Sequence, residues 1–350
     1  MFADVRAAGA HINWGGDDPM NDLQRAAADL VASPRGILAA DESPGTMDKR
    51  LEGQRIPASE DARRAYREML VSTPDLATSI SGVILCEETF NQRLSDGRPF
   101  PEALTQMRLV TGVKVDTGAK DLAGAPGETI TEGLDGLRER LQDFAARGAV
   151  FAKWRAVFTI GPGLPTHRAL RANAHALARY AGLCQEQGIV PIVEPEVVAA
   201  GDHSLEQCEA ATNFALIEVF TELAHAGVDL GGMVLKPNMV TPGLDRLGGE
   251  TAAEVAERTV ATLHGTVPAE VAGIAFLSGG QPAEVATANL AGIAARHAPW
   301  PLTFSFGRAL VDQALQDWGG RPEGVAAGQS ALAERVRATS AALGAEVQRV

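Results

Sequence analysis

The chain of 350 residues contains only three cysteines, Cys86, Cys184 and Cys208, and none of them forms a CxxC pair. An odd number of cysteines without that spacing predicts neither a disulfide framework nor a thiolate metal site. We therefore expect all three to be buried as small hydrophobic residues.

Long apolar runs and an excess of basic residues are also missing. No segment reaches about 18 uninterrupted apolar residues, and the first residues lack a basic stretch followed by an apolar one. The 31 Lys and Arg residues against 44 Asp and Glu residues give a net charge of −13, which argues against a nucleic-acid binder or a membrane-surface protein. We expect a cytoplasmic protein in which any anionic ligand binds to a local cluster of positive charge.

What the sequence does contain is a recurring apolar run that ends in polar residues. Eight such runs, about 30 to 45 residues apart, predict buried strands, and helical patterns lie between many of them. The runs are 36–43, 82–87, 112–116, 149–155, 189–196, 232–238, 273–280 and 302–308, and the helical patterns are 22–33, 134–144, 168–187, 204–226, 251–264, 282–297 and 323–344.

Apolar strands that alternate with helices describe either a doubly wound sheet or a closed (β/α)8 barrel. The number and even spacing of the runs favour the α/β class with a TIM barrel. We expect a single domain over residues 1–350, with an N-terminal arm (1–20) and an extra helical segment near each terminus, the second followed by a short tail (323–350). No stretch rich in Pro, Gly or Ser is long enough to divide the chain.

Lys236 follows the apolar residues Met233–Leu235 and precedes Pro237. Because proline has no N–H for the sheet, the lysine is expected at the carboxyl end of a strand. Apolar neighbours lower the pKa of a lysine from about 10.4, and only the free amine attacks a carbonyl. An isolated sequence of this kind more often holds a lysine that reaches to water. A functional role is favoured here because several other strands also end in charged residues.

In such a barrel the carboxyl ends of the strands form one rim, where active sites lie. Glu194 and Glu196 are two residues apart, so both are expected to point into the lumen, where repulsion raises the pKa of one of them. Lys153 and Arg155 repeat this spacing and supply positive charges, although a purely structural ion-pair network remains the alternative. The predicted rim carries Asp41, Lys114, Lys153, Arg155, Glu194, Glu196, Lys236, Ser278 and Arg308.

Two loops at this rim are typical of phosphate binding. Ser278–Gly280 and Gly307–Arg308 each precede a helix, after the seventh and the eighth strand, so free N–H groups and one guanidinium face the rim. Lys114, together with Ser43 and Thr46, predicts a second anion site across the rim. Two such sites suit a sugar that is phosphorylated at both ends.

Seven motifs, in this order, resemble those of class I fructose-bisphosphate aldolases over roughly residues 20–345. They are Gly36-Ile37-Leu38-Ala39-Ala40-Asp41-Glu42-Ser43, Gly112-Val113-Lys114-Val115-Asp116, Phe151-Ala152-Lys153-Trp154-Arg155, Val193-Glu194-Pro195-Glu196, Leu235-Lys236-Pro237-Asn238-Met239-Val240, Leu277-Ser278-Gly279-Gly280-Gln281 and Gly307-Arg308-Ala309-Leu310.

The resemblance implies that Lys236 forms a Schiff base with the C2 ketone of fructose 1,6-bisphosphate. It also implies that Glu194 is the main acid and base, that Asp41 acts at the C4 hydroxyl, and that Lys153 and Glu196 manage charge around the carbinolamine, with Arg155 beside them. The implied phosphate contacts are Ser278, Gly279, Gly307 and Arg308 for C1, Ser43, Thr46 and Lys114 for C6, and Lys49 and Arg50 at further basic positions. Neither a metal nor another cofactor is implied, and the family usually forms tetramers, so we expect a homo-oligomer.

Two alternatives remain open at this point, whereas zinc chemistry is not favoured. A zinc aldolase would hold its metal largely through histidines, but none of the seven histidines ends a predicted strand, so no metal site is expected. A related lyase would cleave sedoheptulose 1,7-bisphosphate or fructose 1-phosphate, and a non-catalytic binding protein would retain only the fold. The chain also lacks the terminal tyrosine of animal members, which makes Glu194 a candidate for protonating the enamine.

Overall fold

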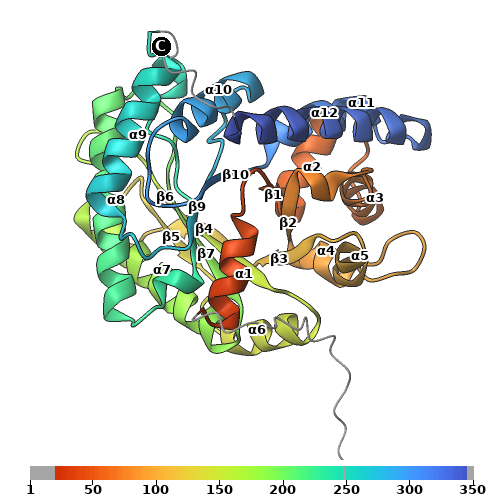
Figure 1. Cartoon of the computed structure of the whole chain (residues 1–350), viewed down its shortest axis with the longest axis horizontal. Coiled ribbons are helices and arrows are strands. Elements are labelled where there is room, and N and C mark those ends of the chain that lie inside the picture. Colours follow the sequence, from red (N-terminus) through yellow and green to blue (C-terminus); the bar gives the residue numbers. More distant parts are fainter. Residues whose placement is uncertain (1–19, 247–248, 345–350) are drawn as a thin grey trace, which may run out of the picture.

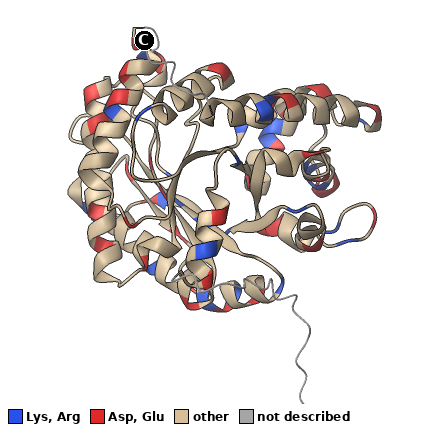
Figure 2. Ribbon diagram, in the orientation of Figure 1, with Lys and Arg blue, Asp and Glu red and all other residues tan. Residues whose placement is uncertain are grey.

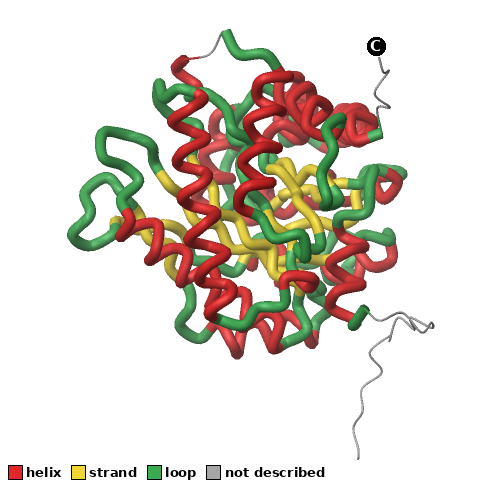
Figure 3. The backbone as a smooth tube through the Cα atoms, turned by 60° about the vertical axis from the view of Figure 1, so that its left-hand side comes forward, coloured by secondary structure: helices red, strands yellow, loops and turns green. Residues whose placement is uncertain are grey.

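The architecture is a closed barrel of eight parallel strands enclosed by helices (Figure 1, Figure 3). It comes from a computed structural model that describes residues 20–246 and 249–344. Around the barrel the strand order is β1, β10, β9, β8, β7, β6, β3 and β2, which confirms the barrel and not the doubly wound sheet. The predicted arm, apart from Met20, and the tail after residue 344 lie outside the described residues.

The barrel strands are short and almost wholly buried, because helices cover their outer face and side chains fill the lumen. Each strand starts within two residues of its predicted run. The strands are β1 (Gly36–Ala40), β2 (Ile80–Leu85), β3 (Val110–Lys114), β6 (Phe151–Phe158), β7 (Val190–Val197), β8 (Val234–Leu235), β9 (Gly273–Phe276) and β10 (Leu302–Phe306).

The predicted helices are present, and several begin with a capping residue whose side chain accepts a backbone N–H. Asn21 and Ser204 each form a capping box at the first turn. The predicted C-terminal segment is divided into a short turn (Pro322–Gly324) and a long helix. These helices are α1 (Asp22–Leu30), α6 (Leu137–Ala146), α7 (His167–Glu186), α8 (Leu205–His225), α9 (Ala252–Thr266), α10 (Ala283–Ala294), α11 (Arg308–Trp318) and α12 (Val325–Leu343).

The amino-terminal end of the barrel is filled by apolar side chains. Leu30 of α1 belongs to the same buried cluster as Phe151 and Val234 of the lumen. A Cβ added to Gly112 would lie 2.1 Å from the ring of Phe151, so glycine at this position leaves room for the aromatic ring. Because this end is closed by α1 and packed aromatics, the open end of the lumen is the carboxyl end.

Six elements were not predicted from the sequence. Four are helices, the longest of which carries Tyr66, Met69 and Leu70 at a helical spacing, and two are strands that form an antiparallel hairpin after β3. They are α2 (Pro44–Gly53), α3 (Glu60–Val71), α4 (Glu87–Asn91), α5 (Phe100–Gln106), β4 (Gly118–Asp121) and β5 (Thr129–Glu132).

Charged residues of both signs are spread over the outer helices, and a smaller group lies inside the ring of helices (Figure 2). In the part of the chain that the structure describes, no helix is long and apolar enough to span a bilayer. All three cysteines are buried, as predicted.

Candidate active site

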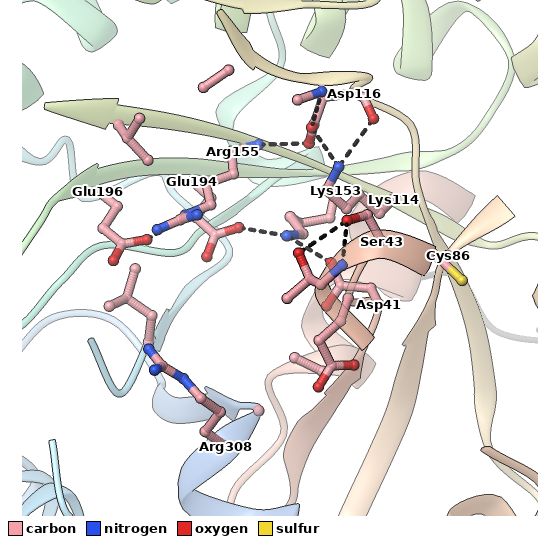
Figure 4. A pocket seen from close by; sticks show the side chains of 18 of the residues that line it. Asp41, Ser43, Cys86, Lys114, Asp116, Lys153, Arg155, Glu194, Glu196 and Arg308 are labelled. Atoms are coloured by element: carbon pink, nitrogen blue, oxygen red, sulfur yellow. Dashed lines mark hydrogen bonds and ion pairs between the residues drawn. The ribbon is translucent and has the colours of Figure 1, made fainter. Parts of the chain in front are cut away.

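A cavity of about 940 Å³ opens at the carboxyl ends of the barrel strands (Figure 4). All fifteen residues that the motifs and the resemblance single out line it. They are Asp41, Ser43, Thr46, Lys49, Arg50, Lys114, Lys153, Arg155, Glu194, Glu196, Lys236, Ser278, Gly279, Gly307 and Arg308.

Lys236 follows the last residue of β8, as predicted, and is only 3% exposed. Its Nζ lies 3.1 Å from Oε1 of Glu194. Burial lowers the pKa of Lys236, because it removes water from the ammonium, and the positive charge of Lys153 adds to this effect. The carboxylates of Glu194 and Asp41 offset only part of the shift. The predicted direction is confirmed, and the free amine is therefore more abundant than in an exposed lysine.

Lys153 lies between two carboxylates at the centre of the cavity. Its Nζ is 2.7 Å from Oδ2 of Asp41 and 3.0 Å from Oε2 of Glu194. Burial alone would lower the pKa of Lys153, but the charges of Asp41 and Glu194 raise it well above its ordinary range. Burial alone would likewise raise the pKa of Asp41, yet Lys153 and Lys236 lower it to about 2. Lys153 is thus a fixed ammonium and Asp41 a fixed carboxylate.

Glu194 and Glu196 are both buried and both line the cavity, as their spacing predicts (Figure 4). The expectation that repulsion raises the pKa of one is wrong for Glu194. Burial raises the pKa of Glu194, but Lys153 and Lys236 outweigh burial and lower it. Glu196 is paired with Nε of Arg155, so each carboxylate has its own positive partner. Proton transfer by Glu194 therefore starts from the ionised form.

The predicted C1-phosphate loops present donors that have no partner in the described part of the chain. Gly279 and Gly280 have φ angles of +59° and +82°, a conformation that favours glycine, and Gln281 N donates to Ser278 O at 3.0 Å to close the turn. A Cβ on Gly280 would lie 3.2 Å from Nη2 of Arg308, so this guanidinium lies beside the turn. Arg308 is exposed and points toward the cavity (Figure 4).

The second predicted anion site has a different character, because some of its positive charges are already paired. Arg50 pairs with Glu42 and lies 2.8 Å from Asp312, and Lys114 pairs with Asp116. Lys49 is exposed and forms no ion pair with the described residues. Nearby, Ser43 Oγ and Thr46 Oγ1 are 3.0 Å apart, and the Ser43 side chain accepts the Thr46 N–H at the start of α2.

Of the cavity residues that were not assigned to the site from the sequence, three make contacts that matter for it or have an unpartnered polar group. Ser305 has a buried hydroxyl with no partner among the described residues. Glu42 accepts hydrogen bonds from Arg50 and the wholly buried Arg67. Asp116 contacts Lys114 and the backbone of Arg155. Two of these residues could have been found from the sequence, because residues two apart along a strand face the same side. Ser305 precedes Gly307 by two residues, and Asp116 follows Lys114 by two.

Histidines, cysteines and carboxylates do not gather into a group of three or more that could hold a metal ion within residues 20–246 and 249–344. The site that these residues do form combines a buried amine, an adjacent carboxylate, a fixed ammonium and unpaired N–H groups. Such a set can form an imine, move a proton to or from it, and hold anionic groups at the rim.

Comparison with known proteins agrees with this arrangement. Residues 22–349 match the family model for class-I fructose-bisphosphate aldolase. The chain is 49% identical over 300 residues, 85% of this chain and 90% of the other, to the "Probable fructose-bisphosphate aldolase class 1" of Xanthomonas campestris. It is 49% identical over 329 residues, 93% of this chain and 91% of the other, to "Fructose-bisphosphate aldolase 6, cytosolic" of Arabidopsis thaliana.

A solved structure of fructose-bisphosphate aldolase from Plasmodium falciparum, in complex with TRAP and a small-molecule inhibitor, superposes with a TM-score of 0.90. It is 42% identical to this chain, and the match covers 93% of this chain and 95% of that one. The chain described here belongs to the class I fructose-bisphosphate aldolase family.

Proposed function

We propose that the protein cleaves fructose 1,6-bisphosphate reversibly to dihydroxyacetone phosphate and glyceraldehyde 3-phosphate, through a Schiff base on Lys236. The observation that carries this proposal is the position of Lys236, buried at the end of β8 with its Nζ 3.1 Å from Glu194. A lysine with a lowered pKa is a nucleophile at neutral pH, and an adjacent carboxylate can manage the protons of imine formation.

The first half of the reaction forms the imine. The free amine of Lys236 attacks the C2 carbonyl, and the ionised Glu194 takes a proton from the attacking nitrogen and passes it to the carbonyl oxygen. A second proton, taken up from solvent, is then delivered by Glu194 to the hydroxyl of the carbinolamine, which leaves as water and gives the protonated imine. Lys153, whose ammonium is fixed between Asp41 and Glu194, stabilises the negative charge that develops on the oxygen. Glu196 and Arg155 balance the charge on the far side of Glu194.

The second half breaks the carbon–carbon bond. Glu194 takes the proton of the C4 hydroxyl, which Asp41 orients, the C3–C4 electron pair moves into the protonated imine, and the aldehyde product leaves. A carboxylic acid, for which Glu194 is the candidate, then returns a proton to C3 of the enamine. Water hydrolyses the imine, releases dihydroxyacetone phosphate and restores the amine of Lys236.

The two phosphates are assigned to opposite parts of the rim. Ser278–Gly280 and Gly307–Arg308 receive the C1 phosphate through backbone N–H groups and one guanidinium. Ser43, Thr46 and Lys114, with Lys49, receive the C6 phosphate, while Arg50 contributes mainly to local structure because Glu42 and Asp312 already engage it.

The direct test is a comparison of kcat/KM for fructose 1,6-bisphosphate, sedoheptulose 1,7-bisphosphate and fructose 1-phosphate in the presence of EDTA. We expect fructose 1,6-bisphosphate to give the highest value, with activity unaffected by the chelator. A Lys114→Ala variant is expected to lose activity toward the two bisphosphates and to keep activity toward fructose 1-phosphate. If fructose 1,6-bisphosphate kinetics do not change in this variant, the C6-phosphate assignment is wrong.

We propose a cytoplasmic homo-oligomer, a tetramer by family resemblance. The cytosolic relative supports the location. For the interface we select the exposed face of α8, where Phe214 and Ile217 are 60% and 51% exposed. The same helix takes part in an ion pair through Glu209, which contacts Arg258, so α8 does not present a single charge sign, and we select a second copy of the same chain as the partner.

Light scattering of a Phe214→Ser/Ile217→Ser variant tests this interface. We expect a smaller assembly than that of the wild type. The matched control is Val285→Ser, which removes another exposed apolar side chain, on α10, and is expected to leave the mass unchanged. An unchanged mass in the α8 variant would place the interface elsewhere.

A further inference from the structure

Asp116 is a buried carboxylate to which the proposed mechanism gives no role. It lies in the loop between β3 and β4, and its side chain is only 2% exposed. Its Oδ1 pairs with Lys114 and accepts the N–H of Gly118 at 3.1 Å, while its Oδ2 accepts the N–H of Arg155 at 3.2 Å (Figure 4). One carboxylate therefore joins β3, the start of the hairpin and β6.

The need for this contact follows from the unequal lengths of β3 and β6. Their pairing ends at Lys114 and Lys153, but β6 continues to Phe158. Beyond the end of β3, the backbone of Arg155 has no strand partner on that side, and buried backbone groups without partners are costly. Asp116 accepts the N–H of Arg155, and Oγ1 of Thr131 donates to its C=O at 2.8 Å.

The same carboxylate controls two positive charges of the cavity. It holds Lys114 directly by an ion pair, and it holds Arg155 through the backbone. Both side chains line the cavity, as do Thr117 and Gly118 of the adjoining hairpin. Without the carboxylate, Lys114 would keep only its 3.0 Å hydrogen bond to the backbone C=O of residue 116, so its long side chain would sample more rotamers, and ordering it on binding would cost conformational entropy.

We propose that Asp116 is a positioning residue that holds Lys114 ready for the phosphate remote from the imine carbon, while it fixes the backbone of Arg155 beside it. Asp116 would thereby set the preference of the enzyme for a bisphosphate over a C1 monophosphate. This inference rests on the proposed function, because it requires the C6 phosphate to lie against Lys114. The phosphate shares the Lys114 ammonium with Asp116 when it binds, so the carboxylate orients the lysine without withdrawing it from the cavity.

The experiment compares the wild type with Asp116→Ala and with a control, Asp121→Ala. Asp121 lies on β4 of the same hairpin, is exposed and does not line the cavity, so this control removes the same charge. In Asp116→Ala, we expect kcat/KM for fructose 1,6-bisphosphate to fall about tenfold, mainly through a higher KM. The free energy needed to order one long side chain corresponds to a change of about this size. In the same variant, kcat/KM for fructose 1-phosphate is expected to change less than about twofold. The control Asp121→Ala is expected to leave kcat/KM unchanged for both sugars.

A second readout separates this inference from the chemistry. Calorimetry with hexitol 1,6-bisphosphate and hexitol 1-phosphate, which cannot be cleaved, measures the preference whether or not the protein is an aldolase. We expect Asp116→Ala to weaken the bisphosphate selectively. Adding Lys114→Met to Asp116→Ala is expected to cost less than it costs in the wild type, because the two residues act together.

Three results would overturn the inference. These are an equal loss for the two hexitol phosphates, tighter bisphosphate binding in the variant, or strictly additive effects of the two substitutions. Should Asp116→Ala fail to fold, Asp116→Asn takes its place, since an amide can still accept the N–H of Arg155 while it loses the ion pair with Lys114. If the wild-type protein prefers the hexitol bisphosphate, and loses that preference in Asp116→Ala, but does not cleave fructose 1,6-bisphosphate, the result would count against the proposed function and not against this inference.

Discussion

The Nζ atom of Lys236 lies 3.1 Å from Oε1 of Glu194, and both side chains are almost completely buried. This contact raises the pKa of the lysine and lowers the pKa of the glutamate. Burial lowers the pKa of Lys236, and Glu194 opposes part of that shift. Lys236 in turn helps to keep Glu194 ionised despite its burial. The contact therefore keeps Glu194 ionised, while burial makes the free amine of Lys236, which attacks in the first step, more abundant than in an exposed lysine.

Replacing Glu194 with Gln separates imine formation from proton transfer. The pKa of Lys236 should fall further, because the opposing carboxylate charge is gone, so the amine remains available. Proton delivery is lost, and we expect kcat to fall by roughly 10² to 10⁴. Steady-state kinetics measure the loss, and borohydride trapping checks that the imine still forms. A kcat close to that of the wild type would remove Glu194 from the mechanism.

Replacing Lys153 with Met should move the acid limb of the pH profile upward. Lys153 and Lys236 keep the pKa of Asp41 at about 2 against the effect of burial. Without Lys153, burial raises that pKa, so the active carboxylate becomes protonated at a higher pH than in the wild type. The profile of kcat between pH 4 and 9 is the measurement, with Lys153→Arg as the variant that retains the charge. Identical acid limbs in the two variants would contradict this assignment.

Removing Arg67 should destabilise the protein strongly. Its guanidinium is fully buried in α3, and it donates to Ala40 O at 3.0 Å and to Glu42 O at 2.8 Å, on either side of Asp41. Arg67→Met leaves the two carbonyls and Oε2 of Glu42 without this donor, although Arg50 still bonds to Oε1 of Glu42, and we expect the free energy of unfolding to fall by about 3 kcal/mol.

The matched control for Arg67 lies on the same helix. Arg64 pairs only with Glu68, one turn away, and is partly exposed. Arg64→Met should cost less than about 1 kcal/mol. Urea unfolding of both variants provides the comparison, and equal losses would mean that the contacts of Arg67 around Asp41 add nothing to stability.

His203 should make stability depend on pH below 7. It lies in the loop after β7 and is only 5% exposed, although nothing in the sequence singles it out as a buried histidine. Burial lowers its pKa, the charge of Asp202 offsets only part of the shift, and neither ring nitrogen has a hydrogen-bond partner among the described residues. The unfolded chain therefore binds a proton near pH 6.5, where the folded chain does not, and stability falls as the pH drops below that value.

A His203→Asn variant tests this, because it cannot titrate and every other group remains. Urea unfolding at pH 7.5 and pH 5.5 should show a larger loss of stability in the wild type than in the variant. Equal losses in the two proteins would mean that His203 is protonated equally in both states.

The sequence was informative where a pattern is local. Val234–Leu235 followed by Lys236 and Pro237 indicates a buried strand with a lysine at its end, and the structure places that lysine accordingly. The pKa of Glu194 could not be predicted, because it depends on Lys153 and Lys236, which come from other strands. The environment of Asp116 could not be predicted from the sequence either. It depends on the end of β3, two residues before Asp116, and on the continuation of β6 beyond the paired residues.

The central claim is that Lys236 forms the imine, and the composition makes it unusually easy to test. The chain has only five lysines. Four of them, Lys49, Lys114, Lys153 and Lys236, line the cavity, and Lys120 does not. The measurement is borohydride reduction in the presence of dihydroxyacetone phosphate and EDTA, followed by peptide mass spectrometry. The account predicts one stable adduct, on Lys236, and none in a Lys236→Arg variant. An adduct mainly on another lysine, or none at all, would contradict it.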